Sequence, residues 1–382
     1  MGGHAFRARL GAKAVFPRMA PGVYHKLKAS CTEALQRHFK FVGVPPEDPE
    51  KPDFGDLDIM AFDPISHDTP SSEEIRVALG AEHVITTGQS RNFALLAEGS
   101  PSEPIMTDIA DHDEPRQYHQ VDLTILATRS LWESVIFHHS YGDLGLILTL
   151  FCKPYGLAYS QGGLKVRDSP YSYYCVQWIY FPQVGLKAYQ KRHDSHPFTL
   201  STSPRDISSF LGLDYGRLNE GFSTRLAIFD WLATSRFFRP EIFLRTGNIL
   251  RERKMYQEFV SYANARAPSA SRLNLDQPSD SPVDFEALAV DLGIVAEATV
   301  EEALVYFGRR DEWYLIAESI FRRKALKEKL NGKLVEQITG LKGVIIRSII
   351  ASVKEMASED ELVLMEPDEI QGLIQKAASH LG

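Results

Sequence analysis

Two aspartates inside one strand-like run, Asp56 and Asp58, have the clearest chemical meaning in this sequence. The run extends from residue 53 to 62 and is otherwise mainly apolar. Side chains alternate faces along a β-strand, so both carboxylates point the same way while Leu57 and Ile59 point into a core. Adjacent carboxylates repel each other, and a hard divalent cation with oxygen ligands removes that cost. The pair therefore predicts a site for Mg²⁺ or Mn²⁺.

A third acid, Asp122, lies in a second strand-like run over residues 120–126. If the two strands are neighbours, Asp122 becomes a third ligand. Three such carboxylates can hold two metal ions roughly 3.5–4 Å apart and support in-line displacement at phosphorus. The alternative is a set of solvent-facing carboxylates at a sheet edge.

Length, charge and cysteine content restrict the class of protein. A chain of 382 residues can form two or three domains, and a hydrophobic content of 44% is typical of a soluble globular protein. The net charge of −8 argues against coating nucleic acid with the whole surface, but it permits a local basic patch. Three cysteines without a C-x-x-C pair indicate a reducing compartment, cytoplasmic or nuclear. The longest apolar run, 144–152, is too short to span a bilayer, so no membrane partner is expected.

Hydrophobic periodicity and turn residues predict alternating strands and helices up to about residue 165. The predicted helices cover 23–39, 71–79, 131–141, 143–155, 223–238, 251–263 and 311–330, and further strands cover 84–87 and 93–96. This pattern predicts a small sheet domain over 1–165 and a largely helical middle domain over 166–266. A linker rich in proline and serine follows over 267–282, and a helical C-terminal domain covers 283–382.

Gly2-Gly3 comes first in the chain, Asp56-x-Asp58 follows on one strand and Asp122 on a later one, and this order resembles the DNA polymerase β-like nucleotidyltransferase superfamily over roughly residues 1–165. Four segments, Gly2-Gly3-His4-Ala5-Phe6, Phe54-Gly55-Asp56-Leu57-Asp58-Ile59, Gln120-Val121-Asp122-Leu123 and Tyr141-Gly142-Asp143-Leu144-Gly145, are also similar to a little-studied branch found in large DNA viruses and fungi. The resemblance implies an α+β fold with a small mixed-sheet, palm-like catalytic domain.

The same resemblance implies roles for individual residues. Gly2 and Gly3 would contact a nucleoside triphosphate such as ATP. Asp56 and Asp58 would hold two magnesium ions, and Asp122 would act beside them at the attacking hydroxyl. Gly3 and Asp56 are 53 residues apart, farther than in most of the superfamily. Either this branch carries an inserted helix, or the glycines are only an N-terminus.

A basic segment lies near the C-terminal end, where nine bases and two acids between residues 322 and 354 give a local charge of +7. Its stretches 330–335 and 339–346 are similar to the RNA-holding C-terminal segment of CCA-adding and poly(A)-type nucleotidyltransferases. The resemblance implies that Lys333, Lys342 and Arg347 contact nucleic-acid phosphates. The alternative is a glycine-capped helix boundary with a solvated lysine face.

Together these features predict a metal-dependent nucleotidyltransferase. It would move a nucleoside monophosphate from a triphosphate to a hydroxyl, with the 3′ end of RNA as the expected acceptor and pyrophosphate as the leaving group. One alternative is a non-catalytic nucleic-acid-binding protein built on a degenerate nucleotidyltransferase fold. Another is an enzyme that transfers the nucleotide to a protein hydroxyl. The intact acids favour catalysis, and the basic segment favours a nucleic-acid partner.

Overall fold

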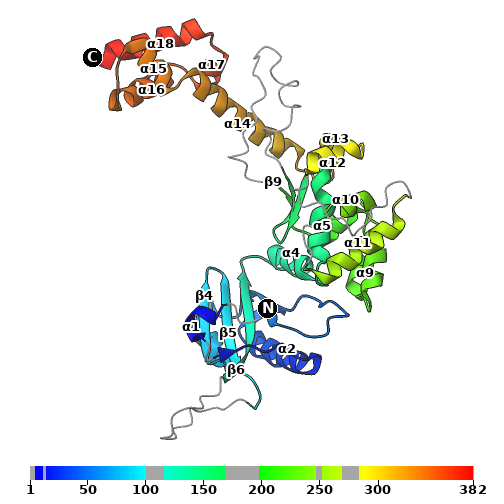
Figure 1. Cartoon of the computed structure of the whole chain (residues 1–382). Coiled ribbons are helices and arrows are strands. Elements are labelled where there is room, and N and C mark those ends of the chain that lie inside the picture. Colours follow the sequence, from blue (N-terminus) through cyan, green and yellow to red (C-terminus); the bar gives the residue numbers. More distant parts are fainter. Residues whose placement is uncertain are drawn as a thin grey trace. The chain divides into compact units, whose positions relative to one another are not determined.

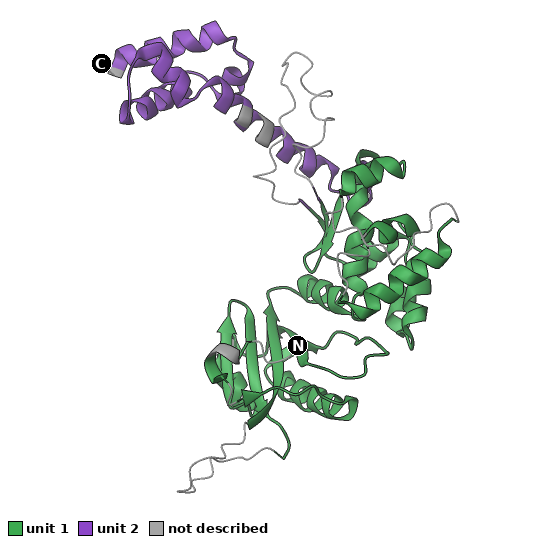
Figure 2. Cartoon of the chain, in the orientation of Figure 1, with its two compact units in different colours: residues 1–166, 199–300 green, residues 167–198, 301–382 purple. Residues whose placement is uncertain are grey.

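The computed structural model describes residues 5–11, 14–99, 116–167, 198–246, 252–268 and 284–381. Contacts divide the chain into two compact units: unit 1 comprises residues 1–166 and 199–300, and unit 2 comprises 167–198 and 301–382 (Figure 2). One compact unit can contain more than one domain, so the predicted domain limits stay a prediction. Gly2, Gly3 and nearly all of the predicted linker lie outside the described residues.

Unit 1 starts with a six-stranded sheet whose strand order is β2-β3-β6-β5-β4, with β1 added on β6 (Figure 1). The strands are β1 Ala14–Val15, β2 Phe39–Gly43, β3 Asp56–Pro64, β4 His83–Thr87, β5 Ser90–Leu96 and β6 Arg116–Leu126. β6 pairs in parallel with β3 and β1, and the remaining pairs are antiparallel. The predicted fold class, α+β with a small mixed sheet followed by helices, is confirmed.

One face of this sheet is apolar and lies under two helices, α2 (Pro21–Gln36) and α3 (Ser72–Leu79). Leu57, Ile59, Val121 and Leu123 are fully buried there together with side chains of both helices. α3 begins with a capping box formed by Ser71 and Glu74. The prediction that the first helix reaches residue 39 is wrong, because alternating side chains from Phe39 onward pair with β3 as β2.

The opposite face of the sheet is apolar at its two ends, with Ala94 and Tyr118 packed on Phe6 at one end and Met60 and Leu126 at the other. Helix α4 (Arg129–His139) packs on Met60 and Leu126 there, and the indole Nε1 of Trp132 donates a hydrogen bond to the Met60 carbonyl at 3.0 Å. Since Asp56, Asp58 and Asp122 precede these residues on the same strand faces, the acids lie beyond the part covered by α4.

The rest of unit 1 is mainly helical, with a second, three-stranded sheet in the order β7-β8-β9. Its elements are α5 Leu144–Cys152, η2 Lys153–Tyr155, β7 Leu157–Ser160, β8 Gly163–Val166, β9 Phe198–Ser201, α7 Pro204–Leu211, α8 Tyr215–Glu220, α9 Arg225–Ala233, α10 Pro240–Thr246, α11 Lys254–Arg266, α12 Phe285–Asp291 and α13 Ala296–Tyr306. Helix α13 crosses the boundary to unit 2. The short helix α1 (Arg7–Leu10) lies beside the first sheet. Phe151, Phe243 and Phe259 form an aromatic core, with ring centroids 5.2 Å and 4.8 Å apart along the series. The three strands of the second sheet were not predicted.

Among the helices that the structure describes, no single one is long and apolar enough to cross a membrane. The helix pair 129–139 and 144–155 meets those criteria only when taken together, across a bend of 99°.

Unit 2 ends in a small helical bundle with its own core. Its helices are α14 Arg310–Lys329, α15 Gly332–Thr339, α16 Val344–Met356, α17 Glu359–Leu364 and α18 Pro367–Leu381. Val335, Ile349, Val353 and Leu362 are fully buried in that core. The turn between α15 and α16 contains Gly340 and Gly343, both at positive φ, where glycine has no steric penalty.

Candidate active site

The strand register brings the three predicted acids to one face of the first sheet. β3 and β6 run in parallel with Asp58 opposite Asp122 and Asp56 opposite Gln120. Residues that lie opposite each other on neighbouring strands point to the same side. Asp56, Asp58 and Asp122 therefore share the face that the apolar core leaves free.

Two side-chain amides hold the carboxylate of Asp122. Nδ2 of Asn92, which lies opposite Asp122 on β5, donates to Oδ1 at 2.6 Å. Nε2 of Gln120 lies 2.9 and 2.8 Å from the two carboxylate oxygens. Partial burial raises the pKa of Asp122, while these amide hydrogen bonds act in the opposite direction. Asp122 is thus a fixed carboxylate in a largely desolvated setting.

Asp58 has the most strongly raised pKa of the resolved shifts in this group. Its pKa is raised to about 7, first because the surrounding protein desolvates the carboxylate and second because Asp56 and Asp122 repel it. Lys51 offsets part of this repulsion. Among the described residues, neither Asp56 nor Asp58 makes a side-chain hydrogen bond or an ion pair. Asp58 is nevertheless exposed to solvent at the cavity surface, so water partly screens its charge.

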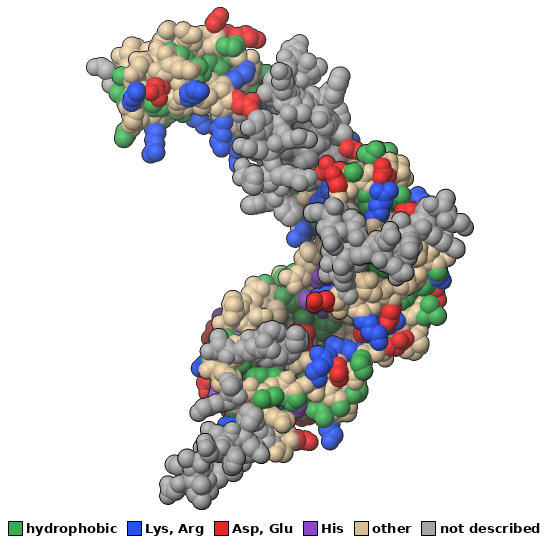
Figure 3. All heavy atoms as spheres, in the orientation of Figure 1, with side chains coloured by type: hydrophobic (Ala, Val, Ile, Leu, Met, Phe, Trp, Pro, Cys, Tyr) green, Lys and Arg blue, Asp and Glu red, His purple; other side chains and the backbone are tan. Residues whose placement is uncertain are grey.

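A cavity of about 590 Å³ borders Asp56 and Asp58. Its walls come from the loop before β3, from the start of α11 and from the residues after α4, and they include Lys51, Arg253 and Lys254. On the face drawn in Figure 3, acidic and basic side chains of unit 1 gather around a hollow. The lining carries both carboxylates and cations, which suits a ligand that carries both a metal ion and phosphates.

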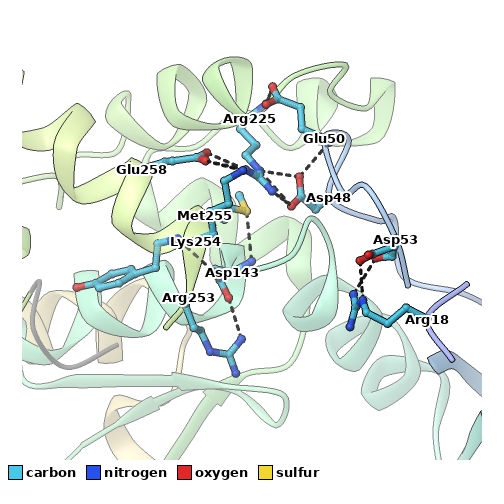
Figure 4. A network of polar contacts seen from close by, with 11 residues as sticks. Arg18, Asp48, Glu50, Asp53, Asp143, Arg225, Arg253, Lys254, Met255 and Glu258 are labelled. Atoms are coloured by element: carbon cyan, nitrogen blue, oxygen red, sulfur yellow. Dashed lines mark hydrogen bonds and ion pairs between the residues drawn. The ribbon is translucent and has the colours of Figure 1, made fainter. Parts of the chain in front are cut away.

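The cations of this cavity differ in how far they are already engaged. Nε of Arg18 pairs with Asp53 at 2.6 Å, and Nη1 of Arg253 pairs with Asp143 at 2.8 Å (Figure 4). Lys254 is 80% exposed and lies 3.9 Å from Glu258, at the outer limit of an ion pair. Lys51 lies over the ring of Phe54 at 4.9 Å. Lys51 and Lys254 are therefore the cavity cations most available to a bound anion.

Sequence reasoning did not identify these two lysines. The sequence singles out no cation for the triphosphate, and Lys153 and Lys165, two basic residues that follow the predicted acids in the chain, do not line the cavity. Lys153 lies over the ring of Phe285, and Lys165 is part of β8. Lys51 and Lys254 lie in a loop and at a helix start, where no periodic pattern marks a cation for function.

The three carboxylates differ in how well they suit a divalent cation. Within the described parts of the chain, the carboxylate oxygens of Asp56 and Asp58 have no competing partner, which fits Mg²⁺ or Mn²⁺. The Asp122 oxygens, however, are turned toward the two amides. Within the part of the chain that the structure describes, no three His, Cys, Asp or Glu side chains are arranged to hold a metal ion. The fit is therefore that of a carboxylate pair with Asp122 beside it.

The segment Tyr141-Gly142-Asp143, part of the family resemblance, has a structural role here. The Asp143 carboxylate is almost buried and accepts hydrogen bonds from Arg253 and from the Tyr256 backbone N–H, which lies in the first turn of α11. Tyr141 and Gly142 both have positive φ, and a Cβ on Gly142 would lie 3.0 Å from the sulfur of Met255. This segment fixes the start of α11 beside the cavity.

The predicted nucleic-acid contacts Lys333, Lys342 and Arg347 are exposed at the surface of unit 2. Lys333 lies in the first turn of α15, Lys342 in the turn before α16 and Arg347 in the first turn of α16. Gly332 and Ile346 are neighbours, so the first turns of the two helices lie side by side. No side chain caps the N-terminus of α16. Lys and Arg side chains are visible at the surface of this bundle in Figure 3.

Comparisons with known proteins find likeness among solved structures alone. No protein-family model matches the sequence, and no curated protein matches it. Among solved structures, the chain is similar to polymerase beta from Leishmania infantum in a ternary gap complex, with 14% sequence identity and a TM-score of 0.30. The match covers 52% of this chain and 69% of that chain. A likeness of this size assigns neither an activity nor a substrate.

Proposed function

We propose that this protein is a metal-dependent nucleotidyltransferase that moves a nucleoside monophosphate from a triphosphate to a hydroxyl acceptor. The observation that supports the proposal is the register of β3 and β6, which sets Asp58 beside Asp122 on the face shared with Asp56. Mutually repelling carboxylates at the edge of a charged cavity destabilise the metal-free fold. Such costly arrangements are typical of functional sites.

Asp56 and Asp58 would hold Mg²⁺ or Mn²⁺, since their oxygens have no other partner among the described residues. When bound, the metal supplies Lewis-acid stabilisation of the negative charge on phosphate oxygens. Lys51 and Lys254 would bind the polyphosphate from two walls of the cavity. Gly2 and Gly3 stay a prediction as further triphosphate contacts.

Asp122 would orient the attacking hydroxyl and accept its proton. Its partial desolvation raises its pKa, which makes the carboxylate a better proton acceptor at neutral pH. The hydrogen bonds from Asn92 and Gln120 keep it from rotating freely. The electrons of the hydroxyl oxygen form the new bond to the α-phosphorus, and pyrophosphate leaves with the bonding pair of the broken P–O bond.

The acceptor that we propose is the 3′ end of RNA. Lys333, Lys342 and Arg347 would contact its phosphates, because all three are exposed and two lie at adjoining helix starts. Lys342 lies only 3.4 Å from Glu336, but it is 80% exposed, so this surface ion pair would yield readily to a phosphate.

The proposal is tested by incubating the protein with each labelled nucleoside triphosphate, magnesium and total RNA. We expect extension of RNA 3′ ends by wild type and loss of extension in Asp58→Asn. Asp63→Asn is a matched control, because Asp63 lies on the same strand but pairs with Lys40 away from the cavity.

Other outcomes would point to the alternatives. Label on protein instead of RNA would favour a protein-nucleotidylating enzyme. RNA binding without turnover of any triphosphate would favour a non-catalytic binder. Calorimetry with magnesium and triphosphate gives an independent check, because the double substitution Asp56→Asn with Asp58→Asn should abolish metal-dependent binding. Equal binding by wild type and the double variant would show that the metal does not bind Asp56 and Asp58.

A further inference from the structure

Arg225, the first residue of α9, occupies the centre of a nearly buried charge cluster beside the cavity (Figure 4). Its guanidinium donates to Asp48 through Nε at 2.9 Å and through Nη2 at 2.6 Å. Its backbone N–H donates to Glu50 at 2.9 Å. The side chains of Arg225 and Asp48 are each only 8% exposed.

The remaining donor of this guanidinium holds an acid of α11. Nη1 of Arg225 lies 2.8 and 2.9 Å from the two carboxylate oxygens of Glu258. Glu258 follows Lys254 by four residues on the same helix, and such side chains are neighbours on the helix surface. Lys254 nevertheless lies 3.9 Å from Glu258, farther than a normal charged hydrogen bond. Glu258 is therefore bound by Arg225 and not by Lys254.

From this competition we propose that Arg225 is a positioning residue that keeps Lys254 free for an anionic ligand by holding Glu258. The proposal rests on the proposed function, in which Lys254 binds the polyphosphate of the substrate. Without the guanidinium, both oxygens of Glu258 lose their partner and the carboxylate turns to the nearest cation. That cation is Lys254, so a phosphate must then displace Glu258 from the Lys254 ammonium before it can bind there.

The test begins with a double variant that leaves the net charge of the cluster unchanged. Removing Arg225 alone would strand a buried Asp48 carboxylate and endanger folding, so we combine Arg225→Met with Asp48→Asn. Binding of inorganic tripolyphosphate with magnesium is then measured by calorimetry. We expect the double variant to bind up to about fivefold more weakly than wild type, because Glu258 then competes with the phosphate for Lys254.

Two triple variants separate the proposed role from a general effect of charge. Adding Glu258→Gln removes the competitor of Lys254 and should restore binding to that of wild type within the error of the measurement. Adding Glu50→Gln removes one negative charge from the same cluster at an exposed position that does not contact Lys254. This control should bind as weakly as the double variant.

A second starting variant, Arg225→Lys, keeps the test possible if the double variant folds poorly. In Arg225→Lys a single ammonium replaces the fork-shaped guanidinium, and it cannot bind two carboxylates in the same way. It should stay with the buried Asp48 and release Glu258, so tripolyphosphate binding should weaken similarly and Glu258→Gln should again restore it. Melting curves would report the folding of each variant.

The outcomes distinguish the inference from the proposed function. If wild type transfers nucleotides but the double variant binds tripolyphosphate normally, the role of Arg225 is wrong and the function stands. Equal recovery with Glu258→Gln and Glu50→Gln, or recovery with neither, also overturns that role. If wild type binds neither triphosphate nor tripolyphosphate, the proposed function fails, and the inference fails with it.

Discussion

Replacing Asp58 by Asn should make the metal-free protein more stable at neutral pH, although it should abolish activity. The pKa of this carboxyl is raised from 3.8 to about 7 in the folded protein, so the folded state binds its proton more tightly than the unfolded state does. Stability therefore falls as the pH rises through this window. Asn keeps the shape of the side chain and removes the charge that Asp56 and Asp122 repel.

The size of the effect follows from the pKa difference. A rise from 3.8 to about 7 corresponds to about 4 kcal/mol if the carboxylate is fully withdrawn from water. Asp58 is exposed at the cavity surface, and solvent screening reduces this value. We expect Asp58→Asn to raise the free energy of unfolding by about 1–2 kcal/mol above pH 7. The gain should shrink below pH 7 and vanish below about pH 4, where the carboxyl is protonated in both states.

Urea denaturation between pH 4 and pH 8 in the presence of a chelator measures this difference. Asp63→Asn is the control, because that carboxylate pairs with Lys40 at 3.0 Å and its removal should not stabilise the protein. Added magnesium should stabilise wild type and not Asp58→Asn, since ligand binding to the folded state alone raises stability. An Asp58→Asn protein that is no more stable than wild type at pH 8 without metal would refute the reasoning.

Three further predictions concern other parts of the molecule. Asp122→Asn should reduce the rate of nucleotide transfer by about 10²–10⁴-fold, because this acid is proposed to accept the proton of the attacking hydroxyl. The affinity for triphosphate, measured by calorimetry, should stay nearly unchanged. Loss of both transfer and triphosphate affinity would mean that Asp122 contacts the nucleotide. Lys342→Ala with Arg347→Ala should flatten the slope of log affinity for RNA against log salt by about one to two units, with base preference unchanged, and an unaltered slope would mean a solvated helix face. Gly145→Ala should lower the free energy of unfolding by about 1–3 kcal/mol in denaturant titrations, because its Cβ would lie 2.1 Å from the His138 carbonyl oxygen. An unchanged free energy of unfolding would show that α4 and α5 can shift apart.

The elements around the acids could be predicted because their signals are local. Alternation of side chains in 56–62 and 120–126 predicts two strands, and the structure has β3 and β6 over these residues. The predicted helices 131–141 and 311–330 agree with α4 and α14 to within two residues. Strands β2, β7, β8 and β9 were missed, because each is five residues or shorter and depends on its partner in the sheet.

The arrangement of the site needs contacts that no local pattern encodes. The sequence places Asp122 on a strand, but only the register of β3 and β6 sets it opposite Asp58. Asn92 and Gln120 are ordinary polar residues until that register points them at Asp122. In the same way, the pairing of Asp48 with Arg225 joins positions 177 residues apart.

That long separation also sets an order of events during protein synthesis. The acids on β3 leave the ribosome early, whereas Arg225 and the first turn of α11 follow about 170–200 residues later, which at 5–20 residues per second is a delay of about 10–40 s. Until Arg225 has been synthesised, Asp48 lacks its guanidinium partner, and until α11 follows, the β3 carboxylates lack Lys254. A polypeptide truncated before residue 254 would therefore be expected to need a chaperone and to lack nucleotide affinity, even though its first sheet is fully encoded.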